Sequence, residues 1–286
     1  MQIFAPAKIN LRLEVLGRLP NGYHLLRMFN LTVSLRDLLE LEWRDQGIEI
    51  KVDESTIPAD QRNTVFRAIA YFQKKFGISF GVRVKMRKRI PAGAGLAGGS
   101  SDAAAVLKAL MTKFGIPISR LNLEEVAYQI GADVPYLLSG GPAWVEGIGE
   151  KIEPVSNFPP LSCLLVKPGF ASSTFEVYQA LGRVSDLTIE PKEVILEAII
   201  NGNWKDFCVN HLEKVVFARQ REMERLKSEI LRLGALAAVM SGSGSTLVGI
   251  FSTSEQAEKG AKEILKFQPD LWVEVVKEDQ PGAARK

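Results

Sequence analysis

Apolar residues at every second position predict that the first half of the chain consists mostly of β-strands. This spacing occurs at residues 9–15, 38–43 and 48–52, and it places alternate side chains on one buried face of a strand. A Pro-Asn-Gly sequence at residues 20–22 predicts a turn between strands. We therefore expect a sheet as the first layer of the fold.

Helical spacing of apolar residues begins further along the chain. Residues 64–76 and 123–130 have it, and a glycine follows each segment, where helices commonly end. Asn122 and Glu125 fit a capping box at the start of the second segment. Helices are thus expected to alternate with strands from residue 64 onward.

The second half predicts an α+β unit. Residues 142–155 resemble a hairpin, and the polar, proline-containing residues 156–160 predict a domain boundary. Beyond the boundary we expect strands at 161–167, 235–240, 246–251 and 271–276, and helices at 174–181 and 194–233 with a break near Gly202.

Composition narrows the class of protein. The chain has 286 residues, of which 46% are hydrophobic, enough for two packed domains. It has no run of about 18 apolar residues, and residues 1–8 lack the pattern of a secretory signal, so we expect a cytoplasmic protein without a membrane span. Cys163 and Cys208 stand in apolar surroundings and are expected to be buried free thiols.

The charge pattern favours a small-molecule partner. The net charge is only +3, and the basic residues at 83–89 lie along a predicted strand without interleaved aromatic residues. We expect no nucleic-acid partner. The sequence does not predict the oligomeric state.

A glycine-rich segment, P-A-G-A-G-L-A-G-G-S-S at residues 91–101, predicts a phosphate-binding loop. It follows a predicted strand at 81–90 and precedes an Ala-rich segment of high helix propensity. Because its glycines have no Cβ, the backbone can take positive φ and bring N–H groups to a polyphosphate. Ser100 and Ser101 are expected to cap the helix, whose N-terminus would face the same anion.

Other motifs share some of these features. A Walker A motif is excluded, because Gly99 stands where that motif has lysine. Gly93, Gly95 and Gly98 match the G-x-G-x-x-G of dinucleotide-binding folds. Those folds need a second strand ending in an acid about 20 residues later, where residues 118–123 instead enter a helix. A turn that only packs the helix on the sheet is the structural alternative, but four glycines followed by two serines favour phosphate.

Three segments resemble the signatures of the GHMP kinase superfamily: P-A-K-I-N-L at 6–11, the glycine-rich loop at 91–101 and S-G-S-G-S-T at 241–246. Two more, N-G-Y-H at 21–24 and G-A-D-V-P at 131–135, resemble one group of kinases within that superfamily. The segments follow the order of that family and span nearly the whole chain.

The resemblance implies an α+β fold with a two-domain GHMP kinase architecture. The N-terminal, ATP-binding domain, residues 1–156, would hold a mixed sheet with helices. The C-terminal domain, residues 157–286, would be ferredoxin-like. The active site is expected in the cleft between them.

The resemblance also implies transfer of the γ-phosphoryl group of ATP to a hydroxyl, a reaction that depends on positioning and charge neutralisation. Asp133 is the candidate base, because a hydroxyl is a poor nucleophile until a carboxylate accepts its proton. Lys8 is the candidate cation, which would favour the ionised carboxylate and attract phosphoryl charge. Without the resemblance, Asp133 could be a turn cap and Lys8 an exposed strand residue.

ATP and Mg²⁺ are the expected ligands. Mg²⁺ bridges the β- and γ-phosphates, and Ser101 is the candidate protein ligand for it. Asp102 stands where many members of the superfamily have Asn, so its role is left open. The expected ATP-binding residues are Pro91, Ala92, Gly93, Ala94, Gly95, Leu96, Ala97, Gly98, Gly99, Ser100 and Ser101.

Within the superfamily, the closest resemblance is to members that phosphorylate the 2-hydroxyl of a cytidine diphosphate derivative of methylerythritol in the non-mevalonate isoprenoid pathway. Tyr23 could stack on cytosine, and His24 could read its hydrogen-bonding edge. Tyr178 or Phe175 would form the opposite wall. The expected substrate-binding residues are Asn10, Tyr23, His24, Tyr178, Gly242 and Ser243.

Two alternative functions remain open from the sequence. A relative acting on mevalonate, phosphomevalonate or homoserine would have the same loop without needing Tyr23 and His24. A non-catalytic nucleotide-binding module would bind ATP without turnover, but the presence of Lys8 and Asp133 argues against it. His211 lies in a predicted helix and is interpreted as structural.

Overall fold

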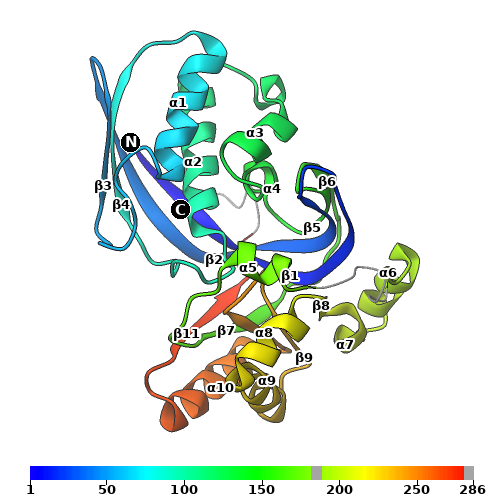
Figure 1. Cartoon of the computed structure of the whole chain (residues 1–286). Helices are drawn as coiled ribbons and strands as arrows, with labels where there is room; N and C mark the ends of the chain where they lie inside the picture. The colour runs from blue at the N-terminus through cyan, green and yellow to red at the C-terminus, as the bar shows by residue number, and fades with distance from the viewer. Residues whose placement is uncertain (182–188, 280–286) are drawn as a thin grey trace.

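The computed structural model describes residues 1–181 and 189–279 and contains two sheets with helices packed on them (Figure 1). The larger sheet forms the upper part of the view, and the smaller sheet lies below it. The predicted α+β class is confirmed.

The larger sheet is organised around one long antiparallel hairpin. β1 (Gln2–Arg18) pairs with β2 (His24–Arg44) along nearly its whole length. The strand order is β3-β4-β2-β1-β8, and β5 pairs with both β2 and β6. The other strands are β3 (Ile48–Val52), β4 (Gly81–Arg87), β5 (Ala143–Gly147), β6 (Lys151–Pro154) and β8 (Val209–Asn210).

A bulge in the hairpin changes which side chains face the large cavity described below. The register of β1 against β2 shifts between Asn10 and Arg12. Side chains alternate along a regular strand, and a bulge re-aims them. Asn10 and Leu13 consequently both line the cavity although an odd number of positions separates them.

Four helices cover one face of the larger sheet (Figure 1). α1 starts after Asn63, whose side chain accepts a hydrogen bond from the Val65 amide, and it ends at Gly77, where φ is 66°. The small alanine side chains of α2 let that helix lie deeply buried between α1 and the sheet. The helices are α1 (Thr64–Phe76), α2 (Gly98–Lys113), α3 (Leu123–Gln129) and α4 (Val134–Ser139), with a 3₁₀ turn at Ile118–Arg120.

The smaller sheet has the ferredoxin-like topology that the resemblance implies. Its order is β11-β7-β10-β9 with antiparallel neighbours, and the chain runs strand, helices, two strands, helix, strand. Its elements are β7 (Ser162–Lys167), β9 (Ala237–Met240), β10 (Leu247–Phe251), β11 (Trp272–Lys277), α5 (Thr174–Gln179), α6 (Lys192–Ile200), α7 (Trp204–Phe207), α8 (Glu213–Arg219), α9 (Arg221–Arg232) and α10 (Ser254–Phe267).

Two predictions of elements are corrected. The prediction of helices throughout 194–233 is wrong in its centre, because β8 interrupts them and pairs with β1 at Arg12 and Leu13. His211 therefore follows a strand. β2 also begins well before the strand predicted at 38–43. The alternation did not reveal this part of it, because residues 27–33 are buried continuously.

The predicted domain boundary falls in the loop between β6 and β7. Later segments nevertheless return to the larger sheet: β8 pairs with β1, and Glu278 forms a bridge with Val33. The division into residues 1–156 and 157–286 stays a prediction.

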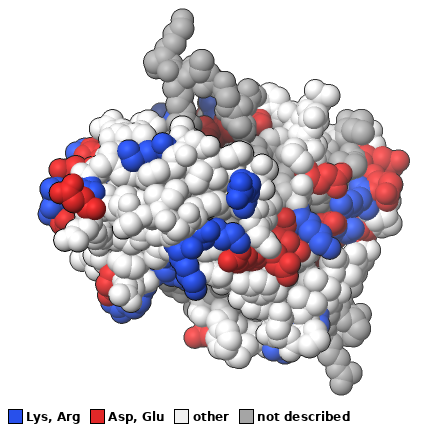
Figure 2. Space-filling model, turned by 90° about the horizontal axis from the view of Figure 1, so that it is seen from above, with Lys and Arg blue, Asp and Glu red and all other residues white. Residues whose placement is uncertain are grey.

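The face seen in Figure 2 carries basic and acidic side chains in mixed groups, separated by wide uncharged areas. In the part of the chain that the structure describes, no helix combines the length and apolar character needed to cross a bilayer.

Candidate active site

One cavity of about 980 Å³ is lined by residues of both sheets and their connecting loops. The loop residues 91–101 line it except for Leu96 and Ser101. The other predicted site residues that line it are Lys8, Asn10, Tyr23, His24, Asp133, Tyr178, Gly242 and Ser243.

The glycine-rich loop leaves its amides available to a ligand. Gly93 and Gly95 have positive φ, 60° and 75°, whereas Gly98 and Gly99 form the first turn of α2. Among the described residues, no protein acceptor takes a hydrogen bond from the amides of residues 95–100. These N–H groups, together with the N-terminus of α2, suit a polyphosphate.

The start of α2 corrects the prediction that Ser100 and Ser101 cap it. The helix begins at Gly98, after Ala97 in the left-handed conformation, without a side-chain capping bond. Ser101 is buried, and its hydroxyl donates a 2.6 Å hydrogen bond to the carbonyl oxygen of Pro6. Of the two serines, Ser100 lines the cavity.

Lys8 and Asp133 meet inside the cavity. The Lys8 Nζ lies 3.2 Å from Asp133 Oδ1 and donates a 2.7 Å hydrogen bond to Asn10 Oδ1. The Lys8 side chain is 5% exposed and that of Asp133 is 31% exposed. Asp133 directly precedes α4 but makes no side-chain capping bond, so its carboxylate is available for the lysine and a ligand.

The turn at residues 241–246 joins the smaller sheet to the loop and to β1. Ser241 Oγ accepts a hydrogen bond from the Asn10 amide (3.1 Å) and donates one to the Gly95 carbonyl oxygen (2.9 Å). A Cβ at Gly95 would lie 2.1 Å from the Ser241 carbonyl oxygen, so only glycine permits this approach. Thr246 also donates its amide hydrogen to Ala94.

Aromatic side chains gather on one side of the cavity. The rings of His24 and Tyr178 are stacked, with centroids 4.8 Å apart and planes 29° apart. Tyr23 makes an edge contact with Tyr128, and Phe175 is 71% exposed. Burial, helped by the nearby Arg18, lowers the pKa of His24, which keeps its imidazole neutral at pH 7.

A buried charge cluster beneath the loop was not predicted. Lys88 Nζ contacts the carboxylates of both Asp37 and Asp102. Asp37 also accepts hydrogen bonds from the amides of Arg89 (2.6 Å) and Ile90 (2.9 Å), which fixes the corner leading into the loop. Lys88 follows the end of β4 at Arg87 and lies on the same side as the apolar Val84 and Met86, where the sequence did not single it out.

The charges of this cluster act on one another. Burial raises the pKa of Asp102 to about 7, opposed by Lys88 and reinforced by Asp37. Burial alone would lower the pKa of Lys88, but the two carboxylates raise it. One oxygen of Asp102 is buried without a hydrogen-bond partner.

Cavity-lining residues from the segment before α1 were also missed. Ile57, Pro58 and Asn63 line the cavity, and Thr64 Oγ1 donates a 2.6 Å hydrogen bond to the Gly99 carbonyl oxygen. These residues come from a loop and a helix start with no motif of their own. Only the fold brings them beside the loop.

Cysteines and metal-binding groups add little to this site. Cys163 and Cys208 are buried and free, as predicted, and burial raises the pKa of Cys163 to about 12. Within residues 1–181 and 189–279, no cluster of three or more His, Cys, Asp or Glu side chains could hold a metal ion.

A glycine-rich anion loop, a lysine–aspartate pair and a ferredoxin-like second sheet define the architecture of a small-molecule kinase. The family model described as GHMP kinases N terminal domain matches residues 63–141, and GHMP kinases C terminal matches residues 192–270.

Curated relatives extend this match to most of the chain. 4-Diphosphocytidyl-2-C-methyl-D-erythritol kinase of Clostridium botulinum (strain Kyoto / Type A2) is 42% identical over 258 residues, 89% of this chain and 92% of that protein. The enzyme of the same name from Clostridium kluyveri (strain NBRC 12016) is 42% identical over 262 residues, 90% of this chain and 93% of that protein. The chain belongs to the GHMP kinase family.

Solved structures agree with this assignment. A crystal structure of 4-(cytidine 5'-diphospho)-2C-methyl-D-erythritol kinase superposes with a TM-score of 0.81 at 34% identity, covering 98% of this chain and 100% of that one. Homoserine kinase from Cytophaga hutchinsonii shares the fold, with a TM-score of 0.72 at 19% identity over 98% of this chain and 94% of that one.

Proposed function

We propose that this GHMP kinase transfers the γ-phosphoryl group of ATP to the 2-hydroxyl of 4-diphosphocytidyl-2-C-methyl-D-erythritol, a step of isoprenoid precursor synthesis. The named relatives at 42% identity and the matching crystal structure support this substrate. The phosphoryl-transfer chemistry is supported chiefly by the Lys8–Asp133 ion pair, which lines the same cavity as the loop at 91–101 with its amides free to bind a ligand.

The triphosphate of ATP binds to the loop amides and the N-terminus of α2. These groups are fixed before the ligand arrives, so they stabilise the charge that builds up during transfer without reorganising. Segment 131–133 adjoins this loop, since a Cβ at Gly131 would lie 3.2 Å from Ser100 Oγ. Asp133 is thereby held beside the phosphates.

Asp133 and Lys8 then assist the transfer. The acceptor hydroxyl passes its proton to the Asp133 carboxylate as its oxygen bonds to the γ-phosphorus, and the bond from that phosphorus to the β–γ bridging oxygen breaks, leaving ADP. Lys8 is paired with the Asp133 carboxylate and neutralises phosphoryl charge. Asn10 fixes the lysine by accepting its hydrogen bond.

The aromatic side of the cavity binds the cytidine. A neutral His24 can both donate to and accept from the edge of cytosine, and Tyr23 offers a ring for stacking. Tyr178 is already stacked on His24, whereas Phe175 is mostly exposed, so Tyr178 is the better-placed second wall. Gly242 and Ser243 lie where the substrate's diphosphate would be bound.

Mg²⁺ fits this site as a partner of the phosphates. Mg²⁺ commonly keeps few protein ligands, and the described residues contain no dedicated cluster. The Ser100 hydroxyl lines the cavity at the loop and would hold it, in place of the buried Ser101. When bound, the ion neutralises charge on the β- and γ-phosphates.

A substrate screen tests the proposal. ATP consumption is measured with the cytidine diphosphate methylerythritol substrate and with mevalonate, phosphomevalonate and homoserine, and the product is analysed for the phosphorylated hydroxyl. Turnover with the cytidine compound alone is expected. Preferred turnover of another alcohol, or ATP binding without turnover, contradicts it. Cytoplasmic location stays a prediction.

A further inference from the structure

Asn210 lies outside the cavity yet holds the turn that lines it. Its side-chain nitrogen donates hydrogen bonds to the carbonyl oxygens of Met240 (2.6 Å) and Gly242 (2.7 Å). Its side-chain oxygen accepts a 2.9 Å hydrogen bond from the Leu212 amide. Asn210 is 6% exposed, so its donors and its oxygen are all used inside the protein.

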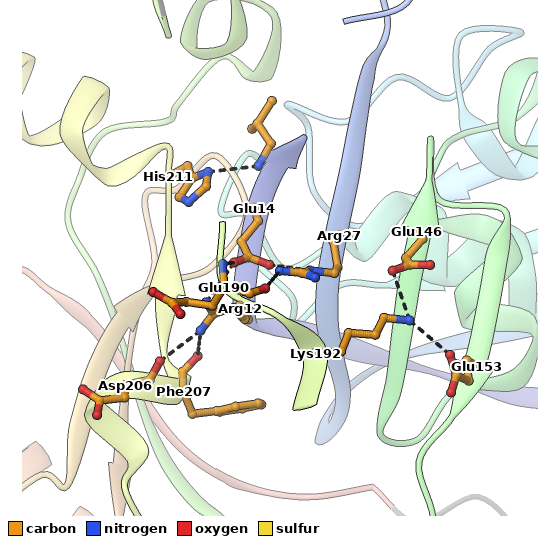
Figure 3. Close-up of polar contacts among 11 residues, drawn as sticks. Arg12, Glu14, Arg27, Glu146, Glu153, Glu190, Lys192, Asp206, Phe207 and His211 are labelled. Carbon is orange, nitrogen blue, oxygen red and sulfur yellow. Dashed lines mark hydrogen bonds and ion pairs between the residues drawn. The ribbon is translucent and has the colours of Figure 1, made fainter. Parts of the chain in front are cut away.

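The backbone around Asn210 is fixed to the strand that carries Lys8. β8 pairs with β1, and His211 donates its amide hydrogen to Leu13 while its Nδ1 accepts a 3.1 Å hydrogen bond from the Val15 amide. The structural interpretation of His211 agrees with this contact, which is drawn in Figure 3.

A buried guanidinium fixes the segment just before Asn210 to the same strand. Arg12 of β1 donates hydrogen bonds to the carbonyl oxygens of Asp206 (2.9 Å) and Phe207 (3.0 Å) and also pairs with Glu14 (Figure 3). The backbone at Asn210 is therefore fixed to β1, and through the Asn210 side chain so are the carbonyl groups that it binds.

The held carbonyl of Gly242 sets the direction of the next amide. The peptide bond between Gly242 and Ser243 is trans, so its N–H points away from its C=O. The C=O points to Asn210, which does not line the cavity, whereas Gly242 and Ser243 do. In the described part of the chain, the amide of Ser243 makes no hydrogen bond to a protein acceptor.

We propose that Asn210 is a positioning residue for the phosphoryl acceptor: by holding the Met240 and Gly242 carbonyls, it aims the Ser243 amide at the acceptor's diphosphate. The inference rests on the proposed function, because a diphosphate-bearing acceptor is its ligand. ATP binds on the loop at 91–101 and does not depend on this amide.

The test compares Asn210→Asp with the wild type in the full-length enzyme. Aspartate keeps the shape and the acceptor for Leu212 but replaces the two donors with an oxygen that repels both carbonyls. We expect KM for the cytidine diphosphate substrate to rise at least about tenfold, because one charge-assisted hydrogen bond to the diphosphate is lost. KM for ATP should change less than about twofold. Asn122→Asp, a cap of α3 that does not line the cavity, is the matched control and should leave both values unchanged.

The possible results distinguish a failure of this inference from a failure of the proposed function. Wild-type enzyme that does not turn over the cytidine substrate contradicts the function itself. Wild-type turnover with an unchanged acceptor KM in Asn210→Asp, or with both KM values raised alike, overturns the positioning role. Asn210→Ala and Asn210→Ser serve as further variants, and failure of all three to fold also overturns it, since the side chain would then serve the fold alone.

Discussion

Lys8 Nζ lies 3.2 Å from Asp133 Oδ1, although the two residues come from the first strand and from the turn before α4. The lysine is nearly buried, whereas the carboxylate remains partly open to the cavity. Removing either partner leaves an uncompensated charge at the point where we propose that the acceptor hydroxyl loses its proton.

The first prediction concerns this pair. Asp133→Asn and Lys8→Ala are each expected to lower kcat by about 10²- to 10⁴-fold, because a base or a charge-stabilising donor is lost. Steady-state kinetics measure the effect, and circular dichroism checks the fold. Lys75→Ala, which breaks the surface ion pair with Glu125, is the control and should keep wild-type kcat. Near-normal kcat in both site variants would remove the assignment.

The second prediction concerns Gly95. Alanine there would place its Cβ against the Ser241 carbonyl oxygen at a φ of +75°, so the loop must shift. We expect Gly95→Ala to lose ATP binding by at least about tenfold, measured by calorimetry, together with stability. Gly115→Ala is the control: it has a φ of +64° but open space around its Cβ, so it should cost about 1–2 kcal/mol of strain and leave ATP affinity unchanged. Equal ATP affinity in the two variants would contradict the predicted role of the loop.

The third prediction concerns pH and His24. Its pKa is lowered from 6.5, so the imidazole stays neutral down to that pH and becomes charged only in more acidic solution. KM for the cytidine substrate should be flat from pH 8 to 6.5 and rise below that range, while KM for ATP should not follow it. His24→Phe keeps a ring against Tyr178 but cannot titrate, so its acceptor KM should be higher and independent of pH. A pH-dependent acceptor KM in that variant would assign the titration to another group.

The fourth prediction concerns Asp102. Its pKa is raised by burial to about 7 from an ordinary 3.8, so the folded protein binds this proton more tightly than the unfolded chain. Its stability contribution is complete below about pH 4 and is lost as the pH rises to 7. The free energy of unfolding of Asp102→Asn should therefore exceed that of the wild type by a growing amount between pH 4 and 8, a few kcal/mol at most, and its melting temperature should rise accordingly.

Thermal melts across that pH range measure the difference. Asp60→Asn is the control, because Asp60 is exposed and its pKa is lowered to about 2, outside the range scanned. A constant difference between Asp102→Asn and the wild type would show that Asp102 is not the group that titrates.

The sequence predicted the parts of the site that depend on local chain geometry. The loop at 91–101 and the turn at 241–246 consist of glycines and small polar residues, whose backbone freedom is visible without a structure. Asp133 and Lys8 came from motif resemblance. The same local reasoning failed at Ser100 and Ser101, where the left-handed Ala97 starts the helix earlier than side-chain capping would.

Residues that act through distant partners could not be predicted. Lys88 has the same parity as the buried Val84 and Met86, but only the positions of Asp37 on β2 and Asp102 on α2 show which carboxylates compensate its charge. Asn210 lies in a strand of two residues that exists because β1 offers an edge there. Contacts between residues far apart in the sequence decided both cases.

The single hydroxyl of Ser241 touches backbone from β1 and from the nucleotide loop at once. Separating the two sheets would break both hydrogen bonds and release the loop that we propose binds ATP. We therefore expect fragments divided after β6 to bind ATP only when they reassociate.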